Sequence, residues 1–312
     1  MSAPGKNWLV ADVGATTSRC AISSAGEISS LRVFNNDDTD SLAELLSRYL
    51  EETGATPASC ALAVAAPIDG DEVQMINRDW RFSGKSLRAL GFDRVEIMND
   101  FHAIAYALPL FDDDSRIEIG KASHYRRGNI AVLGPGSGLG MSAWIGGSAA
   151  MCGEGGHITM SGRNETEDEI IAKFREEFGH CSAERVLSGP GLKALHKAMH
   201  GIAMGSPEAI TGNPGDPANA RTLQQFFRFL GSVAADLALI TGASGGVYIA
   251  GGIVPACIEQ IRNSEFRSRF EDKNRYRDYM RAIPTWVITD PVPGLTGLAA
   301  FIGSIRGRDR VN

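Results

Sequence analysis

Short apolar runs along the chain alternate with longer stretches in which apolar residues recur every three or four positions. The short runs are typical of buried strands, and we expect strands at 9–13, 19–22, 28–33, 60–66, 95–98, 130–133, 141–145, 247–250 and 286–289. The longer stretches predict helices at 42–53, 83–90, 101–110, 167–178, 223–240 and 295–305. Strands and helices that follow one another in this way predict an α/β fold.

Two of these helices are preceded by a serine or threonine with a glutamate three residues later, which is the capping-box pattern. The pairs are Ser41 with Glu44 and Thr166 with Glu169. Asn164 opens a glycosylation sequon, but we interpret it as part of the entry to the second helix. Gly179 predicts the end of that helix.

The chain has 312 residues, more than the roughly 250 to 300 that one hydrophobic core usually serves. We therefore expect two domains, with the first ending near the polar run Asp112-Asp113-Asp114. The predicted smaller domain is 1–105 together with a C-terminal helix at about 293–312, and the larger one is 106–292. Both contain an apolar strand, a turn of small residues and a second strand, in LVADVGATTSRCAI and IAVLGPGSGLGMSAWI.

Composition narrows the class of protein. Apolar residues make up 43% and charged residues 22% of the chain, as in a globular protein. A net charge of −6 argues against nucleic acid as the main partner. The arginines between 262 and 281 are interspersed with acidic residues, which favours a solvated helical face over a binding patch. The five cysteines form no metal-ligand spacing, and no stretch of about 18 apolar residues predicts a membrane span. We expect a cytoplasmic enzyme.

The two glycine-containing turns are candidates for phosphate binding, because backbone N–H groups of a thin turn can converge on phosphate oxygens. Neither turn matches the Rossmann or the Walker A pattern. Taken alone, each is more readily explained as a simple hairpin turn. As a pair they are consistent with two phosphate loops on two domains, and Asp12 is then suited to hold Mg²⁺ through its waters.

Polar residues that suit a sugar and a proton transfer form a second group. Asn99 and Asp100 directly follow a predicted strand, where open α/β sheets bind ligands. Glu154 and His157 lie in MCGEGGH, whose glycines would let a ligand lie against the backbone, and Glu184 begins a short helix. Each also has a structural interpretation: Asp100 as a turn residue, Glu154 with His157 as an incomplete metal pair, and Glu184 as a first-turn acid.

The chain resembles the bacterial glucokinases of the hexokinase-like type over essentially its whole length. Eight motifs in order carry the resemblance: VADVGATTSR, AAPIDGDEVQMINRDWRFS, EIMNDFHAIAYALP, GPGSGLG, MCGEGGH, GHCSAERVLSGPG, GGVYIAGGIVP and FEDKNRY. The resemblance implies a two-domain actin-like ATPase (ribonuclease H-like) fold with an interdomain cleft. It implies phosphorylation of glucose by ATP at the 6-hydroxyl, and a homodimer.

The resemblance also assigns roles to residues. It implies that Asp100 is the general base and that glucose is bound by Asn99, Asp100, Glu154, His157 and Glu184. The residues implied to face ATP are Asp12, Gly14, Thr16, Thr17, Gly134, Gly136, Ser137 and Gly138, with Gly251 and Gly252 beside the adenosine. Mg²⁺ is expected with ATP, and zinc is not, because the cysteine cluster of the related repressor and kinase group is absent. The resemblance also implies that Asn77 and Trp80 lie near the sugar or support its site, although Trp80 is equally well explained as a packed residue.

The chain departs from the family's motif at two positions, and two other functions remain possible for it. The family usually has glycine and asparagine where this chain has Ala15 and Thr17. If the backbone at Ala15 required a positive φ, alanine would be strained there by roughly 1 kcal/mol. The alternatives are a kinase for another hexose and a non-catalytic sugar-sensing regulator of the same fold. The retained Asp100 argues against the regulator.

Overall fold

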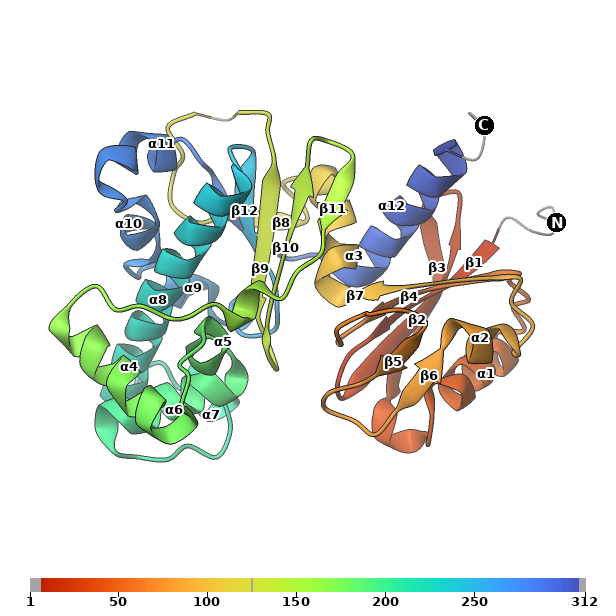
Figure 1. Cartoon of the computed structure of the whole chain (residues 1–312), viewed down its shortest axis with the longest axis horizontal. Coiled ribbons are helices and arrows are strands. Elements are labelled where there is room, and N and C mark those ends of the chain that lie inside the picture. The colour runs from red at the N-terminus through yellow and green to blue at the C-terminus, as the bar shows by residue number, and fades with distance from the viewer. Residues whose placement is uncertain (1–6, 125, 309–312) are drawn as a thin grey trace. The chain divides into compact units, whose positions relative to one another are not determined.

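The computed structural model describes residues 7–124 and 126–308. The chain forms two compact units, and the first is discontinuous in sequence. Unit 1 consists of Met1–Leu110 and Pro291–Asn312, and unit 2 of Phe111–Asp290. In Figure 1, red to orange elements and the blue helix α12 (Pro293–Arg308) make up unit 1.

Unit 1 is built on a five-stranded sheet with the order β3-β2-β1-β4-β7. The strands are β1 (Asn7–Val13), β2 (Thr17–Ser24), β3 (Glu27–Asn35), β4 (Ser59–Val64) and β7 (Arg94–Asn99). The first three form an antiparallel meander, and β4 and β7 continue the sheet parallel to β1. Each of the five predicted strands of this unit is confirmed, with longer bounds in all but one case.

Helices cover both faces of this sheet (Figure 1). Alternate residues of β1 point to opposite faces, so that Leu9 packs with α1 (Leu42–Thr53) while Trp8 packs with α12. The second face also carries α3 (Asp100–Ala107), which lies against α12. The remaining short elements of the unit are η1 (Asn36–Asp38), β5 (Glu72–Gln74), β6 (Arg81–Ser83), α2 (Gly84–Arg88) and η2 (Leu108–Leu110).

Unit 2 repeats this strand order and adds one strand. Its sheet runs β11-β10-β9-β12-β13-β8. The strands are β9 (Ile130–Pro135), β10 (Leu139–Ile145), β11 (Ala149–Met151), β12 (Gly246–Ile249), β13 (Thr285–Ile288) and β8 (Arg116–Glu118). As in unit 1, an antiparallel meander is followed by two parallel strands. The repeated strand–turn–strand pattern of the sequence is therefore confirmed as the first hairpin of each sheet.

The long helix α8 (Pro217–Thr241) is the centre of the helical part of unit 2. Its phenylalanines and its leucines other than Leu239 are buried with those of the surrounding helices. These are α4 (Glu165–Phe178), α5 (Ala183–Val186), α6 (Gly189–His200), α7 (Glu208–Thr211), α9 (Ile258–Arg262), α10 (Phe266–Glu271) and α11 (Arg277–Arg281), with short turns η3 (Gly155–His157), η4 (Pro255–Cys257) and η5 (Asn274–Tyr276). Within the described residues, none of the helices has the length and hydropathy needed to cross a membrane.

The two predicted capping boxes differ in outcome. At α1, Ser41 Oγ accepts from the Glu44 N–H at 3.2 Å, and Gly54 ends the helix with a left-handed backbone. At α4, the prediction that Thr166 and Glu169 form the cap is wrong. Asn164 Oδ1 accepts from the Glu167 N–H at 3.0 Å, so the helix begins at Glu165. The cap is set there because Glu167, and not Glu169, turns inward and is fully buried.

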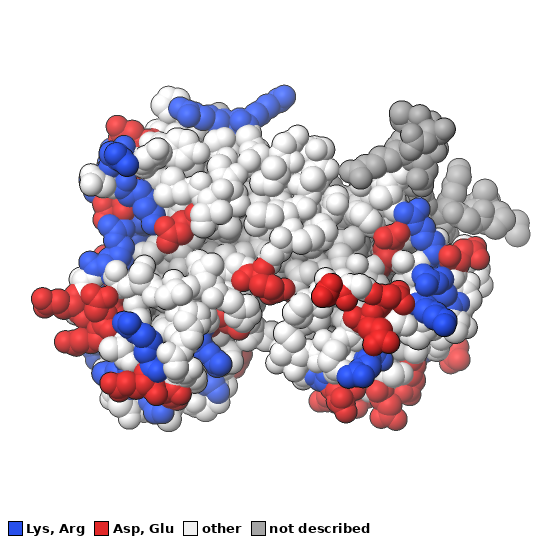
Figure 2. Space-filling view, viewed as in Figure 1, with Lys and Arg blue, Asp and Glu red and all other residues white. Residues whose placement is uncertain are grey.

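The arginine-rich segment of α10 and α11 is more than a solvated face. Basic and acidic side chains are intermixed over these helices (Figure 2). Arg269 turns inward and pairs with the buried Glu167 at 2.7 Å. Arg267 is also largely buried and pairs with Glu271 at 2.8 Å. The segment therefore fastens α10 to α4, while its outer charges face solvent.

Candidate active site

The carboxyl ends of three parallel strands in unit 1 bring several predicted site residues to one edge. Val13, Val64 and Asn99 are register partners across β1, β4 and β7. The next residues along each chain therefore lie at the same edge of the sheet. Ala65 N–H donates to Val13 O at 3.0 Å and ties this edge together. The first glycine loop and the Asn99-Asp100 pair thus share one edge, the position at which open α/β sheets bind ligands.

Asn99 and Asp100 form the junction between β7 and α3. The Asn99 side-chain oxygen accepts from the backbone N–H groups of Phe101 at 2.9 Å and His102 at 3.3 Å, and it therefore caps α3. Its amide nitrogen donates to Ala66 O at 3.3 Å. Asp100 is the first residue of the helix, is partly buried, and accepts from the Phe101 N–H at 2.9 Å. Asn99 thus fixes the start of the helix that carries Asp100.

The first glycine loop is a hairpin turn between β1 and β2. Gly14 N–H donates to Thr17 O at 3.1 Å and closes the turn, at whose tip Thr16 is exposed. Among the described residues, the non-glycine positions with positive φ are Ala25, Ser30 and Asn274. Ala15 is therefore not strained by its backbone, and its replacement of the family's glycine carries no conformational penalty.

Asp12 lies beside this loop, on the strand that leads into it. Its carboxylate contacts the start of α12, where a Cβ added to Gly294 would come within 2.8 Å of Asp12 Oδ2. Burial raises the pKa of the Asp12 carboxyl, and the charge of Arg19, its cross-strand partner, partly offsets that rise. A divalent cation would compensate such a charge, so this carboxylate fits the water-mediated magnesium role.

Two residues that contact the first loop were not identified from the sequence. Asn36 is fully buried and donates from its side chain to Gly14 O at 2.9 Å. Arg78 Nε donates to Ala15 O at 3.4 Å. Trp80 is buried beneath the Arg78 guanidinium, 4.8 Å from its ring centre, which supports the interpretation of Trp80 as a packed residue. Asn77 is exposed.

The second glycine loop joins β9 and β10 in unit 2. Gly136 N–H donates to Gly138 O at 2.8 Å, and Gly136 O accepts from Gly189 N–H at the start of α6 at 2.8 Å. Ser137 is exposed at the tip, whereas Gly134 is buried within β9. The loop is therefore a fixed turn that presents the Ser137 hydroxyl.

Gly251 and Gly252 follow β12 and lie at the same edge as the second loop. Ala250 N–H donates to Leu133 O at 2.8 Å. Gly251 has a φ of +84°, and a Cβ there would come within 2.3 Å of Pro135 O. Gly252 is exposed, and a Cβ added to it would have no atom within 4 Å. Gly251 is thus required by the close approach to β9, while Gly252 faces open space.

Glu184 lies against the second loop. It stands in the first turn of α5, as predicted, and its Oε2 accepts from Leu139 N–H at 2.9 Å. A Cβ on Gly138 would come within 2.6 Å of the same oxygen. Glu184 therefore connects α5 with the loop, and its carboxylate is partly buried there.

Glu154 and His157 are exposed at the two ends of η3. The segment that follows η3 pairs with the residues just before Glu184. Thr159 forms a bridge with Ser182, and Ala183 N–H donates to Ile158 O at 2.9 Å. The interpretation of the neighbouring glycines needs correction. A Cβ on Gly156 would lie 2.1 Å from Leu139 O, and one on Gly155 would lie 2.8 Å from Met141 Sδ. These two glycines are used for packing on β10.

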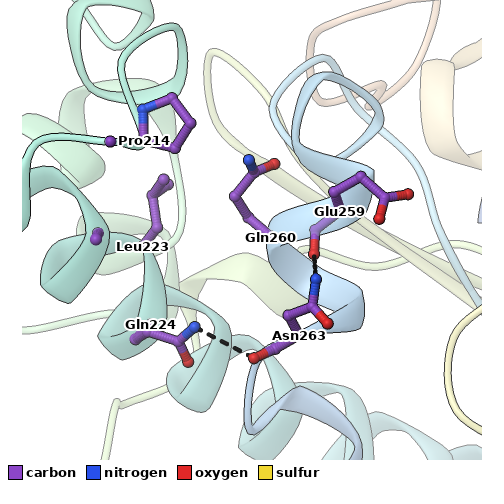
Figure 3. A pocket seen from close by; sticks show the side chains of 8 residues that line it. Pro214, Leu223, Gln224, Glu259, Gln260 and Asn263 are labelled. Carbon is purple, nitrogen blue, oxygen red and sulfur yellow. Dashed lines mark hydrogen bonds between the residues drawn. The ribbon is translucent and has the colours of Figure 1, made fainter.

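A pocket of about 310 Å³ lies in unit 2 between α8 and α9. Figure 3 shows the Gln260 amide directed into the space opposite Pro214 and Leu223. Gln224 donates to Asn263 O at 3.4 Å, and Asn263 donates to Glu259 O at 2.8 Å. The pocket thus combines an apolar wall on α8 with amide groups on α9. In the part of the chain that is described, no cluster of three or more His, Cys, Asp or Glu is suited to a metal ion.

Comparison with known proteins extends over nearly the whole chain. The family model described as glucokinase matches residues 9–304. A glucokinase from Paramagnetospirillum magneticum is 41% identical over 310 residues, which cover 94% of this chain and 97% of the relative. One from Erwinia tasmaniensis is 38% identical, with 97% and 99% covered.

Solved structures agree with the sequence relatives. A glucokinase from an Antarctic psychrotroph has a TM-score of 0.84 and 34% identity, with 96% of this chain and 99% of that chain covered. A ROK family glucokinase from Streptomyces griseus, solved with glucose and AMPPNP, has a TM-score of 0.59 and 17% identity, with 95% and 98% covered. The expected actin-like ATPase fold of sugar kinases is confirmed, and the regulator and other-hexose alternatives are not favoured. The chain therefore belongs to the glucokinase family.

Proposed function

We propose that Asp100 is the general base of the reaction and takes the proton of the glucose 6-hydroxyl. As a member of the glucokinase family, the chain phosphorylates glucose with ATP. The observation that carries the proposal is the position of Asp100, a partly buried carboxylate at the first turn of α3, at the edge of the sheet that also carries the first glycine loop. The Asp100 carboxylate accepts from the Phe101 N–H at the start of the helix, and a carboxylate is a suitable base for a hydroxyl proton.

Glucose is bound by Asn99, Glu154, His157 and Glu184 together with Asp100. Sugar hydroxyls both donate and accept, so carboxylates, an imidazole and an amide suit them. The Asn99 amide oxygen already has two backbone donors, which leaves one N–H of its amide group for a hydroxyl. Glu184 Oε2 accepts from Leu139, and Oε1 is available to the sugar. Glu184 would thereby link the bound sugar to the second loop.

The phosphates of ATP lie against the two glycine loops, at Gly14, Thr16 and Thr17 in the first and at Gly136, Ser137 and Gly138 in the second. The N–H groups of Gly14 and Gly136 close their own turns, so the hydroxyls and the other loop N–H groups are the donors. The buried part of the second loop, Gly134, supports it from within β9. Mg²⁺ is held by Asp12 through its waters and, when bound, neutralises charge on the phosphates. The adenosine lies along Gly251 and Gly252, and the pocket between α8 and α9 holds its base, since η4 and α9 follow these glycines directly.

Phosphoryl transfer passes through a loose transition state, so positioning and charge stabilisation contribute most of the rate. Asp100 orients the attacking hydroxyl and receives its proton as the bond between the 6-oxygen and the γ-phosphorus forms and the bond from the γ-phosphorus to the bridging oxygen breaks, which releases ADP. The loop N–H groups stabilise charge on the transferred group. The residues of the chain thus bind and orient the two substrates, and one of them accepts a proton.

Replacement of Asp100 by asparagine tests the proposal. Asp100→Asn keeps the shape of the side chain but has no basic oxygen, so kcat should fall by about two orders of magnitude or more while the glucose dissociation constant changes little. A coupled ATP assay and calorimetric titration measure the two quantities. Asp278→Asn is the matched control, because it removes an exposed carboxylate whose ion pair spans 3.9 Å. A variant with a near-normal kcat would refute the assignment.

A further inference from the structure

The first glycine loop is held from outside by two residues. Three successive carbonyl oxygens of the loop accept hydrogen bonds from Asn36 and Arg78. Asn36 Nδ2 donates to Gly14 O at 2.9 Å, and its backbone N–H donates to Thr16 O at 2.8 Å. Arg78 Nε donates to Ala15 O, between them, at 3.4 Å. We call Asn36 and Arg78 the loop clasp.

Asn36 is the buried part of the clasp. Its side-chain oxygen accepts from Ser18 Oγ at 2.7 Å, so both ends of the amide are engaged. The residue is 0% exposed. Ser18 belongs to β2, the strand that leaves the loop, and Asn36 follows β3. The sheet itself therefore fixes the position of Asn36 under the turn.

Arg78 uses the full fork of its guanidinium. Besides Nε on Ala15 O, one terminal nitrogen donates to Asn36 O at 2.8 Å and the other pairs with Asp37. The ring of Trp80 lies 4.8 Å beneath the guanidinium carbon, and the side chain is 16% exposed. Lysine has a single nitrogen and cannot make these contacts together. The geometry therefore depends on arginine and not on positive charge alone.

The direction of these bonds matters for an anion. A carbonyl oxygen that points at a phosphate repels it, whereas an N–H group attracts it. With the carbonyls of Gly14, Ala15 and Thr16 bound on the side of the clasp, the loop is prevented from turning them toward a ligand. A short exposed turn that lacked these bonds would sample other conformations and lose entropy on binding.

We propose that Arg78, acting with Asn36, is a positioning residue that holds the first loop in its phosphate-binding conformation. The inference rests on the proposed function, in which this loop binds the phosphates of ATP. Arg78 itself touches neither substrate. It acts through the loop backbone, so its removal alters ATP binding and transfer and leaves glucose binding unchanged.

Kinetics of the full-length chain test this role. Arg78→Gln removes the fork, and Arg78→Lys retains the charge and the alkyl stem. In both variants KM for ATP should rise on the order of tenfold, the effect of one or two lost hydrogen bonds, with KM for glucose within twofold of the unchanged chain. Arg81→Lys is the matched control, because Arg81 is exposed and bonds to Gln74 at 2.8 Å, away from the loop. Its KM for ATP should not change.

The outcomes are distinct. An unchanged KM for ATP in Arg78→Lys, or a parallel rise of both KM values with a lowered Tm, would overturn the positioning role. If Arg78→Gln does not fold, Arg78→Lys still tests the proposal. Thr16→Val, at the exposed tip, separates this failure from that of the proposed function. If Thr16→Val raises KM for ATP while the Arg78 variants do not, only the clasp fails; if neither does, the loop does not bind ATP.

Discussion

Asp12 is a carboxylate that the fold makes costly to ionise. It is partly buried at the carboxyl end of β1 and lies against Gly294 at the start of α12. Burial raises its pKa above the ordinary value, and Arg19 compensates only in part. Residues of this kind are typical of functional sites, where a group is retained for its chemistry at the expense of stability.

We predict that Asp12→Asn makes the chain more stable and less active. Because the folded chain binds the Asp12 proton more tightly than the unfolded chain, the free energy of unfolding falls as pH rises from 3.8 through the raised pKa. Asparagine is never ionised, so the variant should gain about 1 kcal/mol at neutral pH. Thermal unfolding measures this gain, which should vanish below the unfolded pKa. A lower Tm at neutral pH would contradict the prediction.

Gly251 and Gly252 are neighbours with different requirements, and alanine should separate them. Gly251→Ala places a methyl group at positive φ and against Pro135 O, so we expect a loss of about 1–3 kcal/mol in stability. Gly252→Ala meets no neighbour and should leave Tm unchanged. Because we propose that the adenosine lies beside Gly252, the KM of Gly252→Ala for ATP should rise severalfold. Denaturant unfolding measures the stability of both variants, and ATP titration measures their KM for ATP. Equal Tm values for Gly251→Ala and Gly252→Ala would contradict the predicted difference in stability.

At the scale of elements, the contact between α3 and α12 positions Asp100. The two helices approach so closely that a Cβ on Gly297 would lie 1.9 Å from Ala103 O. Ala103 and Leu298 are buried in the same cluster with Val10 of β1. The start of α3, and with it Asp100, is therefore supported by a helix that comes almost two hundred residues later in the sequence.

We predict that Gly297→Ala moves these helices apart. The added methyl group would cost about 1–3 kcal/mol by overpacking and should also lower kcat, because α3 carries the base. Gly303→Ala, on the same helix, meets no atom within 4 Å and should be neutral or slightly stabilising. Thermal unfolding and kcat of both variants measure the difference. Equal stabilities would show that α12 shifts without affecting α3.

Periodicity predicts long elements well and short ones poorly. The buried strands and the helices α1, α3, α4, α8 and α12 are predictable because their apolar residues form short runs or recur at helical spacing. The segment 205–219 is rich in glycine and proline, a composition that predicts a loop, yet it contains α7 and the first turn of α8. Its apolar residues are too few to show a period. At α4, local sequence could not tell which of two glutamates turns inward, since the partner of Glu167 is Arg269 on another helix.

The candidate site was predictable where it follows strand ends and invisible where it depends on tertiary contacts. Asp12, Asn99 and Gly251 each come directly after or within a strand that the apolar pattern predicts. The loop clasp joins Arg78 to a residue 63 positions earlier, a contact that no local spacing reveals. The roles assigned to the site residues, the homodimer and the cytoplasmic location stay predictions.

At the scale of the whole molecule, two sheets with the same strand order carry the two glycine loops at equivalent places. The loops join β1 to β2 in one sheet and β9 to β10 in the other, and each lies at the edge where parallel strands end. The units differ in what surrounds this common sheet: α8 and its neighbours are added in unit 2. In unit 1 this edge also carries Asp100, at the start of α3, and in unit 2 Glu184 of α5 lies against the second loop.

The discontinuity of unit 1 has a consequence for synthesis of the chain. A ribosome releases every residue of unit 2 before it makes α12, so unit 2 can fold while unit 1 waits. Until α12 emerges, the apolar face formed by Val10, Ala61 and Ala103 lacks the helix that covers it in the folded chain. A nascent or truncated chain that ends before Pro293 contains every residue assigned to the site, yet Asp100 lacks its support. We therefore expect activity to appear only after α12 is made.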